Sequence, residues 1–274
     1  LGLHRAGSVG SSHIVMAAAL EAGNLAKALP IYADIILKPA LQPDQFELSR
    51  ELVLQELAGL DDDPRQKVML KLYERFYPAP FGTSPLGTAE QLGALTADKC
   101  RELIKKHFNL SRTIFAVAGK YDFGDLCRQI ETLFDTDQPD AQPDISAGKS
   151  AGKYLHQHHD GAQVHIGLMT PTVPVSSPDY YNAMAAVAVL SGGMSARLFT
   201  EVREKRGLCY AVGAKYHTLK NFAGIASYAG TTPDKAQQTA DIIIEQFKLL
   251  ADGISTDEIG RAKVGLKSSL ILQS

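Results

Sequence analysis

A polar segment near the middle of the chain constrains the possible folds more than any other feature. Residues 135–153 are rich in Asp, Gln, Pro, Gly, Ser and Lys, and apolar residues do not recur among them with a helical or strand period. This composition is typical of an exposed linker, and 274 residues are enough for two domains. We therefore predict an N-terminal domain over residues 1–135, a linker over 136–160 and a C-terminal domain over 161–274.

Short extended runs and amphipathic helices alternate in the N-terminal half. Residues 5–20 are expected to form a hairpin, whose run from 13 to 20 is small and apolar enough to be covered on both faces. A short buried strand is expected over residues 113–118, where apolar side chains alternate. Helices are expected where a cap residue or a proline break precedes a periodic apolar run: 24–36, capped by Asn24, then 44–60, 66–76, 96–107 and 123–134.

The C-terminal half repeats this order of strands and helices. Strands are expected over residues 162–170, 208–219 and 222–230. Helices are expected over residues 178–190 and 232–251, with a last one from 257 onward. Because both halves follow one order, the predicted fold class is α+β, with two similar domains that each pack an antiparallel-rich sheet with helices.

The stretch from Ser195 to Tyr210 contains a distinctive corner. It is expected to form a short amphipathic helix that Gly207 ends, followed by a strand. Strand alternation would place Tyr210 on one face with Val212, Ala214 and Tyr216. The break would bring Arg206 and Tyr210, a cation and a phenol, close together. This pair could grip a peptide carbonyl or carboxylate, or it could belong to an ordinary helix-to-strand corner.

Bulk composition argues against several classes of function. The net charge is −2 and basic residues form no stripe, which argues against nucleic acid as a partner. Three cysteines without C-x-x-C spacing argue against a disulfide framework or a cysteine–zinc site, and they fit a reducing compartment. No apolar run approaches the roughly 20 residues that a membrane-spanning helix needs.

Candidate metal ligands occur in two places. His156, His158 and His159 are close enough in sequence to chelate a metal, although so short a spacing is more typical of the solvated start of a strand. Glu56 falls on the expected buried stripe of its helix, seven residues after Ser49. A carboxylate in that position should either pair with a residue such as a buried arginine or bind something.

Six stretches follow one another along nearly the whole chain in a distinctive order. They are A-G-S-V-G-S-S from Ala6, L-K-P-A-L-Q-P-D-Q-F from Leu37, S-R-E-L-V-L-Q-E-L from Ser49, P-F-G-T-S-P-L-G-T from Pro80, S-A-R-L-F-T-E-V-R-E-K-R-G-L-C-Y from Ser195, and A-K-V-G-L-K-S-S-L-I-L-Q-S at the end. Together they resemble the pitrilysin and mitochondrial processing peptidase family of zinc peptidases, most closely its bacterial members. The most specific parts are R-E-K-R-G-L-C-Y and P-L-G-T.

The resemblance implies the duplicated processing-peptidase-like fold, with two α+β domains around a chamber in which peptide bonds are hydrolysed. Glu56 matches the distal zinc-binding glutamate, whereas Ser49 stands where active members usually carry a supporting glutamate. The inverted H-x-x-E-H helix, which supplies two zinc-binding histidines and the catalytic glutamate, would precede Leu1. We therefore expect a chain cut at both ends, with at most one of three zinc ligands.

Arg206 and Tyr210 match the arginine–tyrosine pair of this family, which holds the substrate backbone and stabilises the tetrahedral oxyanion. The resemblance also implies Zn as cofactor, a peptide or unfolded polypeptide as substrate, and a homodimer or a heterodimer with a sister subunit. Three functions stay open. The chain could be a zinc endopeptidase, a non-catalytic partner that lends Arg206 and Tyr210 to a zinc-bearing sister chain, or a purely structural subunit.

Overall fold

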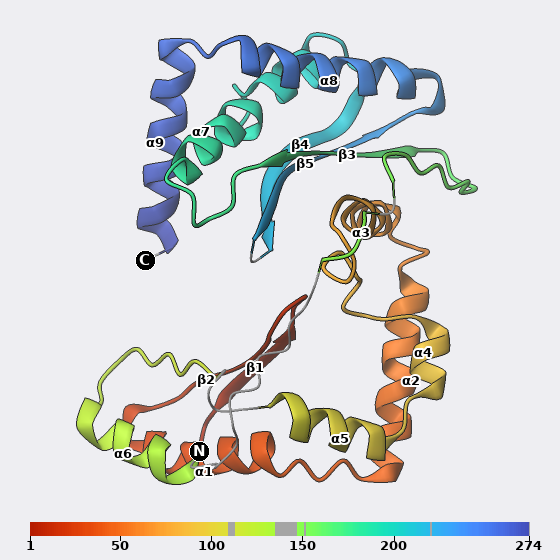
Figure 1. Ribbon diagram of the computed structural model, residues 1–274. Helices are drawn as coiled ribbons and strands as arrows, with labels where there is room; N and C mark the ends of the chain where they lie inside the picture. The colour runs from red at the N-terminus through yellow and green to blue at the C-terminus, as the bar shows by residue number, and fades with distance from the viewer. Residues whose placement is uncertain (109–112, 135–146, 151, 220, 274) are drawn as a thin grey trace. The chain divides into compact units, whose positions relative to one another are not determined.

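A computed structural model describes residues 1–108, 113–134, 147–150, 152–219 and 221–273 (Figure 1). They form antiparallel sheets packed with helices, so the predicted α+β class is confirmed. The chain divides into two compact units, one of Leu1–Gly59 with Pro85–Ser146 and one of Leu60–Ser84 with Ala147–Ser274. Much of the predicted linker, residues 136–146 and 151, lies outside the described residues. Among the described residues, no helix is both long and apolar enough to cross a membrane.

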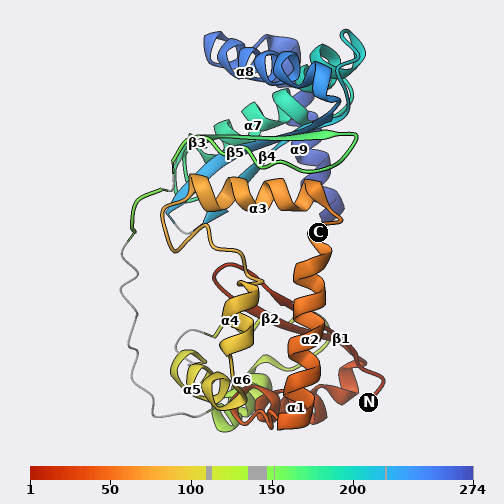
Figure 2. The same ribbon diagram turned by 90° about the vertical axis from the view of Figure 1, so that its right-hand side faces the viewer.

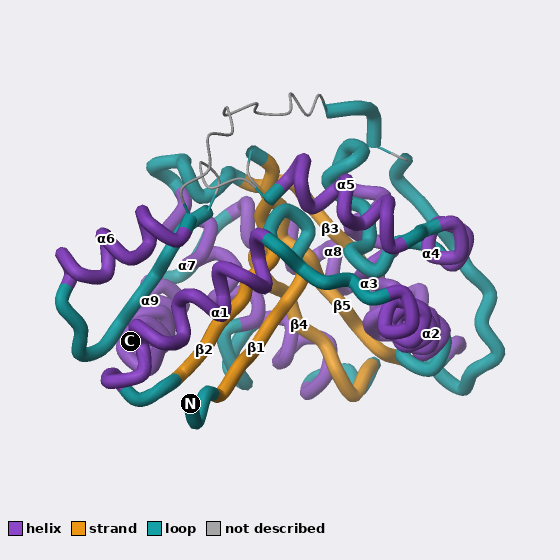
Figure 3. Tube along the Cα trace, turned by 90° about the horizontal axis from the view of Figure 1, so that it is seen from below, coloured by secondary structure: helices purple, strands orange, loops and turns teal. Residues whose placement is uncertain are grey.

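The first unit contains the predicted hairpin. Strand β1 (His4–Val9) pairs antiparallel with β2 (Ile14–Ala19), with Val9 opposite Ile14 next to the turn (Figure 3). Every residue of both strands is exposed, so the expectation that the second run is covered on both faces was wrong. No third strand joins this sheet within the described residues, and a two-stranded ribbon of small residues is too narrow to bury a face by itself.

Helices of the first unit begin where side-chain caps satisfy their free N–H groups. Thr96 accepts a hydrogen bond from Lys99 N, and Thr88 forms a reciprocal capping box with Gln91. Asn24 stands at an N-cap position, but its side chain donates to Leu1 O at 3.2 Å and makes no cap bond. The helical elements are η1 (Ala22–Asn24), α1 (Leu25–Leu37), α2 (Pro43–Gly59), α4 (Ala89–Ala94), α5 (Ala97–His107) and α6 (Phe123–Leu133).

Residues 113–118 do not form the buried strand that their alternation predicts. No strand is assigned there, and the side chain of Ile114 is 91% exposed. Phe115 instead packs edge-on against Phe134, with ring centroids 4.8 Å apart, and Phe134 is buried. An alternating apolar run becomes a strand only where a neighbouring strand accepts its backbone hydrogen bonds, and none pairs with these residues in the described part of the chain.

The second unit is built on a three-stranded antiparallel sheet in the order β3 (Val164–Thr172), β5 (Phe222–Thr231), β4 (Cys209–Leu219). Helices α7 (Tyr180–Ser191) and α8 (Ala236–Asp252) cover one face, and α9 (Thr256–Gln273) follows α8 (Figure 1). Their apolar side chains form the core with β4 and β5. Buried members include Leu190, Leu198, Val202, Ile225 and Ile243.

Helix α3 (Pro64–Phe76) covers the other face of this sheet (Figure 2). Asp63 caps it through Gln66 N at 2.9 Å. The strands approach it closely because they carry glycines there: a Cβ added to Gly167 would lie 3.3 Å from Leu72 Cδ2, and one added to Gly224 would lie 3.0 Å from the Phe76 ring. The sheet of the second unit is therefore sandwiched between α3 and the pair α7 and α8.

Candidate functional site

The corner predicted from the sequence lies between α7 and β4. Its helical part is a π-helix (Phe199–Glu204), marked by the bond from Lys205 N to Thr200 O at 2.9 Å. Gly207 ends it with φ +57°, a left-handed conformation that favours glycine, as expected. The wide turn of a π-helix is uncommon and often marks a functional site.

A β-bulge immediately after Gly207 turns Tyr210 out of the sheet. Cys209 pairs with Thr231, but the next pair joins Ala211 to Gly230, which leaves Tyr210 without a partner opposite it. Cys209 is buried in the core, whereas Tyr210 is 81% exposed. The expectation that Tyr210 shares a face with Val212 was therefore wrong, because the extra residue shifts the alternation by one.

Arg206 is held on the π-helix by Glu201. Its Nη1 donates to the main-chain O of Glu201 and to Oε2 of the same residue, both at 2.7 Å. Lys205 Nζ also donates to Glu201 Oε1, at 2.6 Å. The hydrogen bonds from Lys205 and Arg206 lower the pKa of Glu201, so the carboxylate stays charged and keeps the Arg206 guanidinium in place.

Arg203, which the sequence reasoning missed, supplies a cation directly beside Tyr210. Its guanidinium carbon lies 5.0 Å from the centroid of the Tyr210 ring and 4.8 Å from that of Phe199. Both distances are within the range of cation–π contacts. The spacing from Phe199 to Arg203, four residues on a helix, could have predicted the first contact. The second depends on the bulge, which the sequence does not reveal.

Main-chain contacts fix the turn that carries these side chains. Thr231 Oγ1 donates to Leu208 O at 2.5 Å, and Lys235 Nζ donates to Gly207 O at 3.0 Å. Thr231 is buried, and Thr239 Oγ1 contacts its hydroxyl at 3.3 Å. A buried hydroxyl bonded to a carbonyl holds that backbone rigidly, so the path from Gly207 to Tyr210 is well determined.

Glu56 does not lie on a buried stripe. It is exposed, helix α2 has no buried residue, and Leu52 on the same expected stripe is 57% exposed. Ser49 is exposed as well and donates its hydroxyl back to Gln45 O at 2.8 Å. The apolar periodicity of α2 predicted a buried face, but no hydrophobic core of its unit packs against this helix, so the prediction overstated its burial.

The donor groups of the described residues do not fit a zinc ion. No group of three or more His, Cys, Asp or Glu side chains that could hold a metal occurs in the described part of the chain, and Glu56 belongs to no such group. The histidines at 156, 158 and 159 are exposed. His158 Nε2 contacts Asp160 Oδ1 at 3.0 Å, an arrangement of surface side chains. A tetrahedral zinc site needs several convergent donors.

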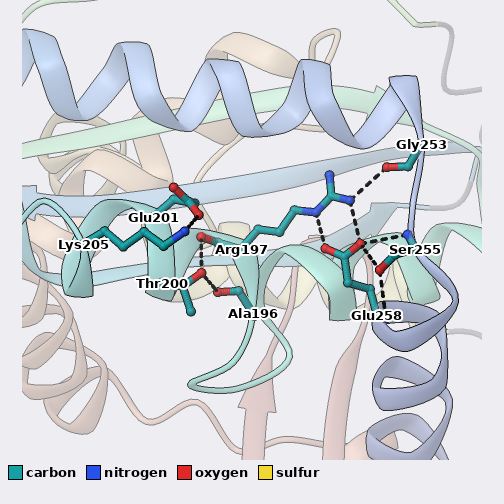
Figure 4. A network of polar contacts seen from close by, with 8 residues as sticks. All are labelled: Ala196, Arg197, Thr200, Glu201, Lys205, Gly253, Ser255 and Glu258. Carbon is teal, nitrogen blue, oxygen red and sulfur yellow. Dashed lines mark hydrogen bonds and ion pairs between the residues drawn. The ribbon is translucent and has the colours of Figure 1, made fainter.

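A second polar cluster joins the segment before the π-helix to α9. Arg197 donates from Nε and Nη2 to the two carboxylate oxygens of Glu258, at 2.6 and 2.9 Å, and from Nη2 to Gly253 O (Figure 4). Ser255 N and Oγ both donate to Glu258 Oε2 at 2.9 Å. These bonds, that from Arg197 first, lower the pKa of Glu258 to about 2.

The sequence of the chain matches a known protein family and known relatives. The family model described as "Peptidase M16 inactive domain" matches residues 94–266. The chain is 29% identical over 249 residues to a protein of Rickettsia bellii and 30% identical over 260 residues to one of Streptomyces coelicolor, both named as uncharacterized zinc proteases. These alignments cover 90% and 91% of the chain but 60% and 57% of the relatives, so the chain spans less than two thirds of their length.

Solved structures share the fold. The peptidase M16 inactive domain from Pseudomonas fluorescens matches with a TM-score of 0.86 and 20% identity, over 98% of this chain and 67% of that one. A chain of complex III from Candida albicans matches with a TM-score of 0.85 and 19% identity, over 98% and 68% of the two chains. A protease from Helicobacter pylori matches at 0.80 and 19%, with the same coverage. At such identities the likeness shows the fold alone.

Proposed function

Because the chain belongs to the M16 peptidase family, whose inactive-domain model it matches, we propose that it binds extended peptide through an arginine–tyrosine clamp and lends this clamp to a zinc-bearing sister chain. One observation carries the proposal: the phenol of Tyr210 is exposed while a guanidinium, that of Arg203, lies beside its ring. A large aromatic side chain that a bulge holds outside the core contributes nothing to the packing of that core.

The clamp has the chemistry to hold a peptide backbone. The Tyr210 hydroxyl can donate to a carbonyl oxygen, and the guanidinium groups of Arg203 and Arg206 can donate to carbonyl or carboxylate oxygens. The guanidinium carbon of Arg203 lies 5.0 Å from the centroid of the Tyr210 ring, and N–H groups of this guanidinium can donate to a ligand bound beside the ring. The proposed clamp thus keeps Arg206 and Tyr210, as predicted from the sequence, and adds Arg203.

The matched family and the side chains of the described residues both support a role in peptide binding without independent hydrolysis. The matched family model is that of an inactive domain, and the described residues hold no group that fits zinc. The peptide bond whose carbonyl the clamp holds would be cleaved by a partner that carries the metal.

Peptide binding can be measured without any catalytic activity. Fluorescein-labelled β-casein, an unfolded polypeptide, is titrated with the full chain and followed by fluorescence anisotropy. Removal of one hydrogen bond by Tyr210→Phe should weaken binding about fivefold. Tyr181→Phe is the matched control, because Tyr181 is another exposed tyrosine of the same unit, at 70%. Equal affinities of the Tyr210→Phe and wild-type chains would refute the clamp.

The two arginines can be separated in the same assay. Arg203→Lys and Arg206→Lys keep the charge but remove the planar donor fork. A loss of affinity in Arg203→Lys alone would assign the clamp to Arg203 and Tyr210. A loss in Arg206→Lys alone would assign it to the pair predicted from the sequence.

Transfer of the clamp to a sister chain needs a mixing experiment. Cleavage of casein should appear only when the chain is combined with a zinc-bearing member of the family from the same organism. It should fall with Arg206→Ala, Arg203→Ala or Tyr210→Phe in this chain. Unchanged cleavage in all three variants would rule out a shared site.

A zinc endopeptidase is the second candidate, favoured by the names of the relatives from Rickettsia bellii and Streptomyces coelicolor. In that case Glu56 would be one zinc ligand of a longer protein. Metal analysis of the full-length gene product should then find zinc, and Glu56→Gln should abolish both zinc binding and peptidase activity. Activity that survives Glu56→Gln would exclude this role.

The duplicated architecture belongs to the same proposal. We propose two similar domains, at 1–135 and 161–274 with a linker over 136–160, and assembly as a homodimer or as a heterodimer with a sister subunit. A chain of complex III from Candida albicans shares the fold over 98% of this chain. Light scattering of the purified chain, alone and mixed with the sister chain, tests the assembly.

A further inference from the structure

The π-helical register makes the main-chain oxygen of Glu201 available to a side chain. In an α-helix, Lys205 N would donate to the oxygen four residues earlier, which is that of Glu201. Lys205 N donates instead to Thr200 O, five residues earlier, at 2.9 Å. The Glu201 oxygen accepts from Nη1 of Arg206 at 2.7 Å. The wide turn thus supplies a main-chain acceptor for an arginine of the proposed clamp.

The carboxylate of Glu201 completes the hold on the same nitrogen of Arg206. Its Oε2 accepts from Nη1 at 2.7 Å, while its Oε1 accepts from Lys205 Nζ at 2.6 Å (Figure 4). Because Nη1 carries two hydrogens, its bonds to the main-chain oxygen and to Oε2 use both of them. One residue therefore satisfies this end of the guanidinium completely.

The bonds at Nη1 leave the opposite edge of the Arg206 guanidinium for a ligand. Both printed hydrogen bonds of this side chain go to Glu201 through Nη1, and Nε and Nη2 bond to no residue that the structure describes. The N–H groups of Nε and Nη2 form a planar fork that binds oxygen acceptors. Arg197 uses the same fork elsewhere in this unit, where it donates to the two carboxylate oxygens of Glu258 at 2.6 and 2.9 Å.

An ordinary surface ion pair would not hold Arg206 in one orientation. Such a pair contributes little to stability, because two long side chains must both lose rotamer freedom to form it. Glu201 differs in that one of its two acceptors is a main-chain oxygen, which the helix already fixes. Its other acceptor belongs to a side chain that is 22% exposed and that Lys205 also binds.

We infer that Glu201 is the positioning residue of the clamp: it anchors Arg206 through Nη1 and presents the Nε–Nη2 edge to the bound ligand. The step that involves the ligand rests on the proposed function. The anchoring is a property of the free chain and does not depend on any ligand. The two steps can therefore be tested separately.

Nuclear magnetic resonance of the free chain, with isotope-labelled arginine, reports the anchoring directly. Rotation about the Cζ–Nε bond exchanges Nη1 with Nη2, and the two bonds at Nη1 should slow this rotation. We expect separate Nη1 and Nη2 signals for Arg206, assigned by their loss in Arg206→Lys. They should merge in Glu201→Gln, because a neutral amide is a weaker acceptor than a carboxylate. Merged signals in the wild-type chain, or separate ones in Glu201→Gln, would overturn the anchoring.

The effect on the ligand is measured with the labelled β-casein titration. Glu201→Gln should weaken binding about fivefold, because the Arg206 fork is then no longer held toward the ligand. Glu204→Gln is the matched control, since Glu204 is exposed on the same helix and its substitution changes the net charge by the same amount. This control should keep both the wild-type affinity and the separate Arg206 signals. Equal affinities of Glu201→Gln and Glu204→Gln would refute the positioning role.

A double-mutant cycle shows whether Glu201 acts through Arg206. In the Arg206→Ala background, Glu201→Gln should cause no further loss of affinity, because no guanidinium remains to be positioned. A further fivefold loss in that background would contradict the inference. Failure of the wild-type chain to bind casein would refute the clamp itself. That result is distinct from normal wild-type binding that Glu201→Gln leaves unchanged, which would refute only the positioning role.

Discussion

The hydroxyl of Tyr77 lies 2.7 Å from Nδ1 of His217 and donates to His217 O at 3.1 Å. Tyr77 directly follows helix α3, and His217 belongs to β4, so this pair ties the helix to the sheet of the second unit. The ring of Tyr73 stacks on the same imidazole, with centroids 4.0 Å apart. Burial raises the pKa of Tyr77 and lowers that of His217, so both rings remain neutral at physiological pH.

The stability of the second unit should fall on mild acidification. The pKa of His217 is lower in the folded chain than its unfolded value of about 6.5, so the unfolded state binds more protons below that value. The contribution of neutral His217 to the free energy of unfolding is therefore fully present above about pH 7. It is lost as the pH falls through 6.5 toward the folded pKa. Urea unfolding at pH values between 8 and 5 measures this loss. His165, whose pKa is also lowered by burial, adds to it in the same direction.

His217→Asn separates the two histidines. This variant cannot titrate at position 217, so the dependence of the unfolding free energy on pH between 7 and 5 should become shallower. An unchanged pH dependence would assign the effect to His165 instead.

Removal of the Tyr77 hydroxyl should destabilise the docking of α3. Tyr77→Phe keeps the ring, which is 1% exposed, and deletes the donor to His217 O. We expect a loss of about 1–2 kcal/mol in the free energy of unfolding, the range for one buried hydrogen bond. Tyr181→Phe, at an exposed ring, should leave it within about 0.5 kcal/mol. If the two variants were equally stable, the hydrogen bond from Tyr77 to His217 O would make no net contribution to the free energy of unfolding.

The ion pair between Arg197 and Glu258 should contribute more than the surface pairs of this chain. Its side chains are 16% and 18% exposed, and two hydrogen bonds join them. Arg197→Met should lower the free energy of unfolding by about 1.5–3 kcal/mol at neutral pH. Arg128→Met is the matched control, because Arg128 and Asp125 are 71% and 60% exposed, and it should cost about 0.5 kcal/mol or less.

The contribution of Glu258 has its own pH window. Because its folded pKa is about 2 against an ordinary value of 4.5, the stabilisation is present above about pH 4.5 and is lost as the pH falls toward 2. Acid unfolding of Glu258→Gln should therefore begin from a lower stability and show a smaller change over this window. An identical acid transition in both proteins would exclude this assignment.

Gly207→Ala should disturb the corner that carries Tyr210. The φ of +57° places Gly207 in the left-handed region, where a Cβ costs about 1–2 kcal/mol. Gly265→Ala is the opposite control, because Gly265 lies within α9 with nothing within 4 Å of an added Cβ. That substitution should stabilise the chain by about 0.5–1 kcal/mol. Thermal unfolding distinguishes the two, and a stabilised Gly207→Ala variant would contradict the role of the turn.

Local signals in the sequence predicted most helices of this fold. A cap such as Thr96, followed by periodic apolar residues, marks a helix start that depends on a few neighbouring residues. The hairpin of β1 and β2 was predicted for the same reason, because its two strands are neighbours in the sequence and are joined by a short turn. Gly207 likewise predicted the end of the short helix before it, which the structure shows to be a π-helix, because a left-handed residue at a helix end favours glycine.

The features that escaped prediction depend on distant partners. The alternation of residues 113–118 indicated a strand, but no neighbouring strand is present among the described residues to pair with them. Glu56 was expected on a buried face, and that burial requires a core that α2 does not contact. Tyr210 and Arg203 meet because of a bulge between Cys209 and Ala211, whose position is set by pairing with β5.

The order of the two units along the chain has a consequence for a nicked molecule. Residues 60–84, with helix α3, belong to the second unit although residues on both sides of them belong to the first. A single backbone break between Lys149 and Ser150 would place α3 on the N-terminal fragment and the three-stranded sheet on the C-terminal fragment. Helix α3 would still pack on the sheet through Leu72, Phe76 and Tyr77. The two fragments would then migrate as one species under native conditions and separate only in denaturant.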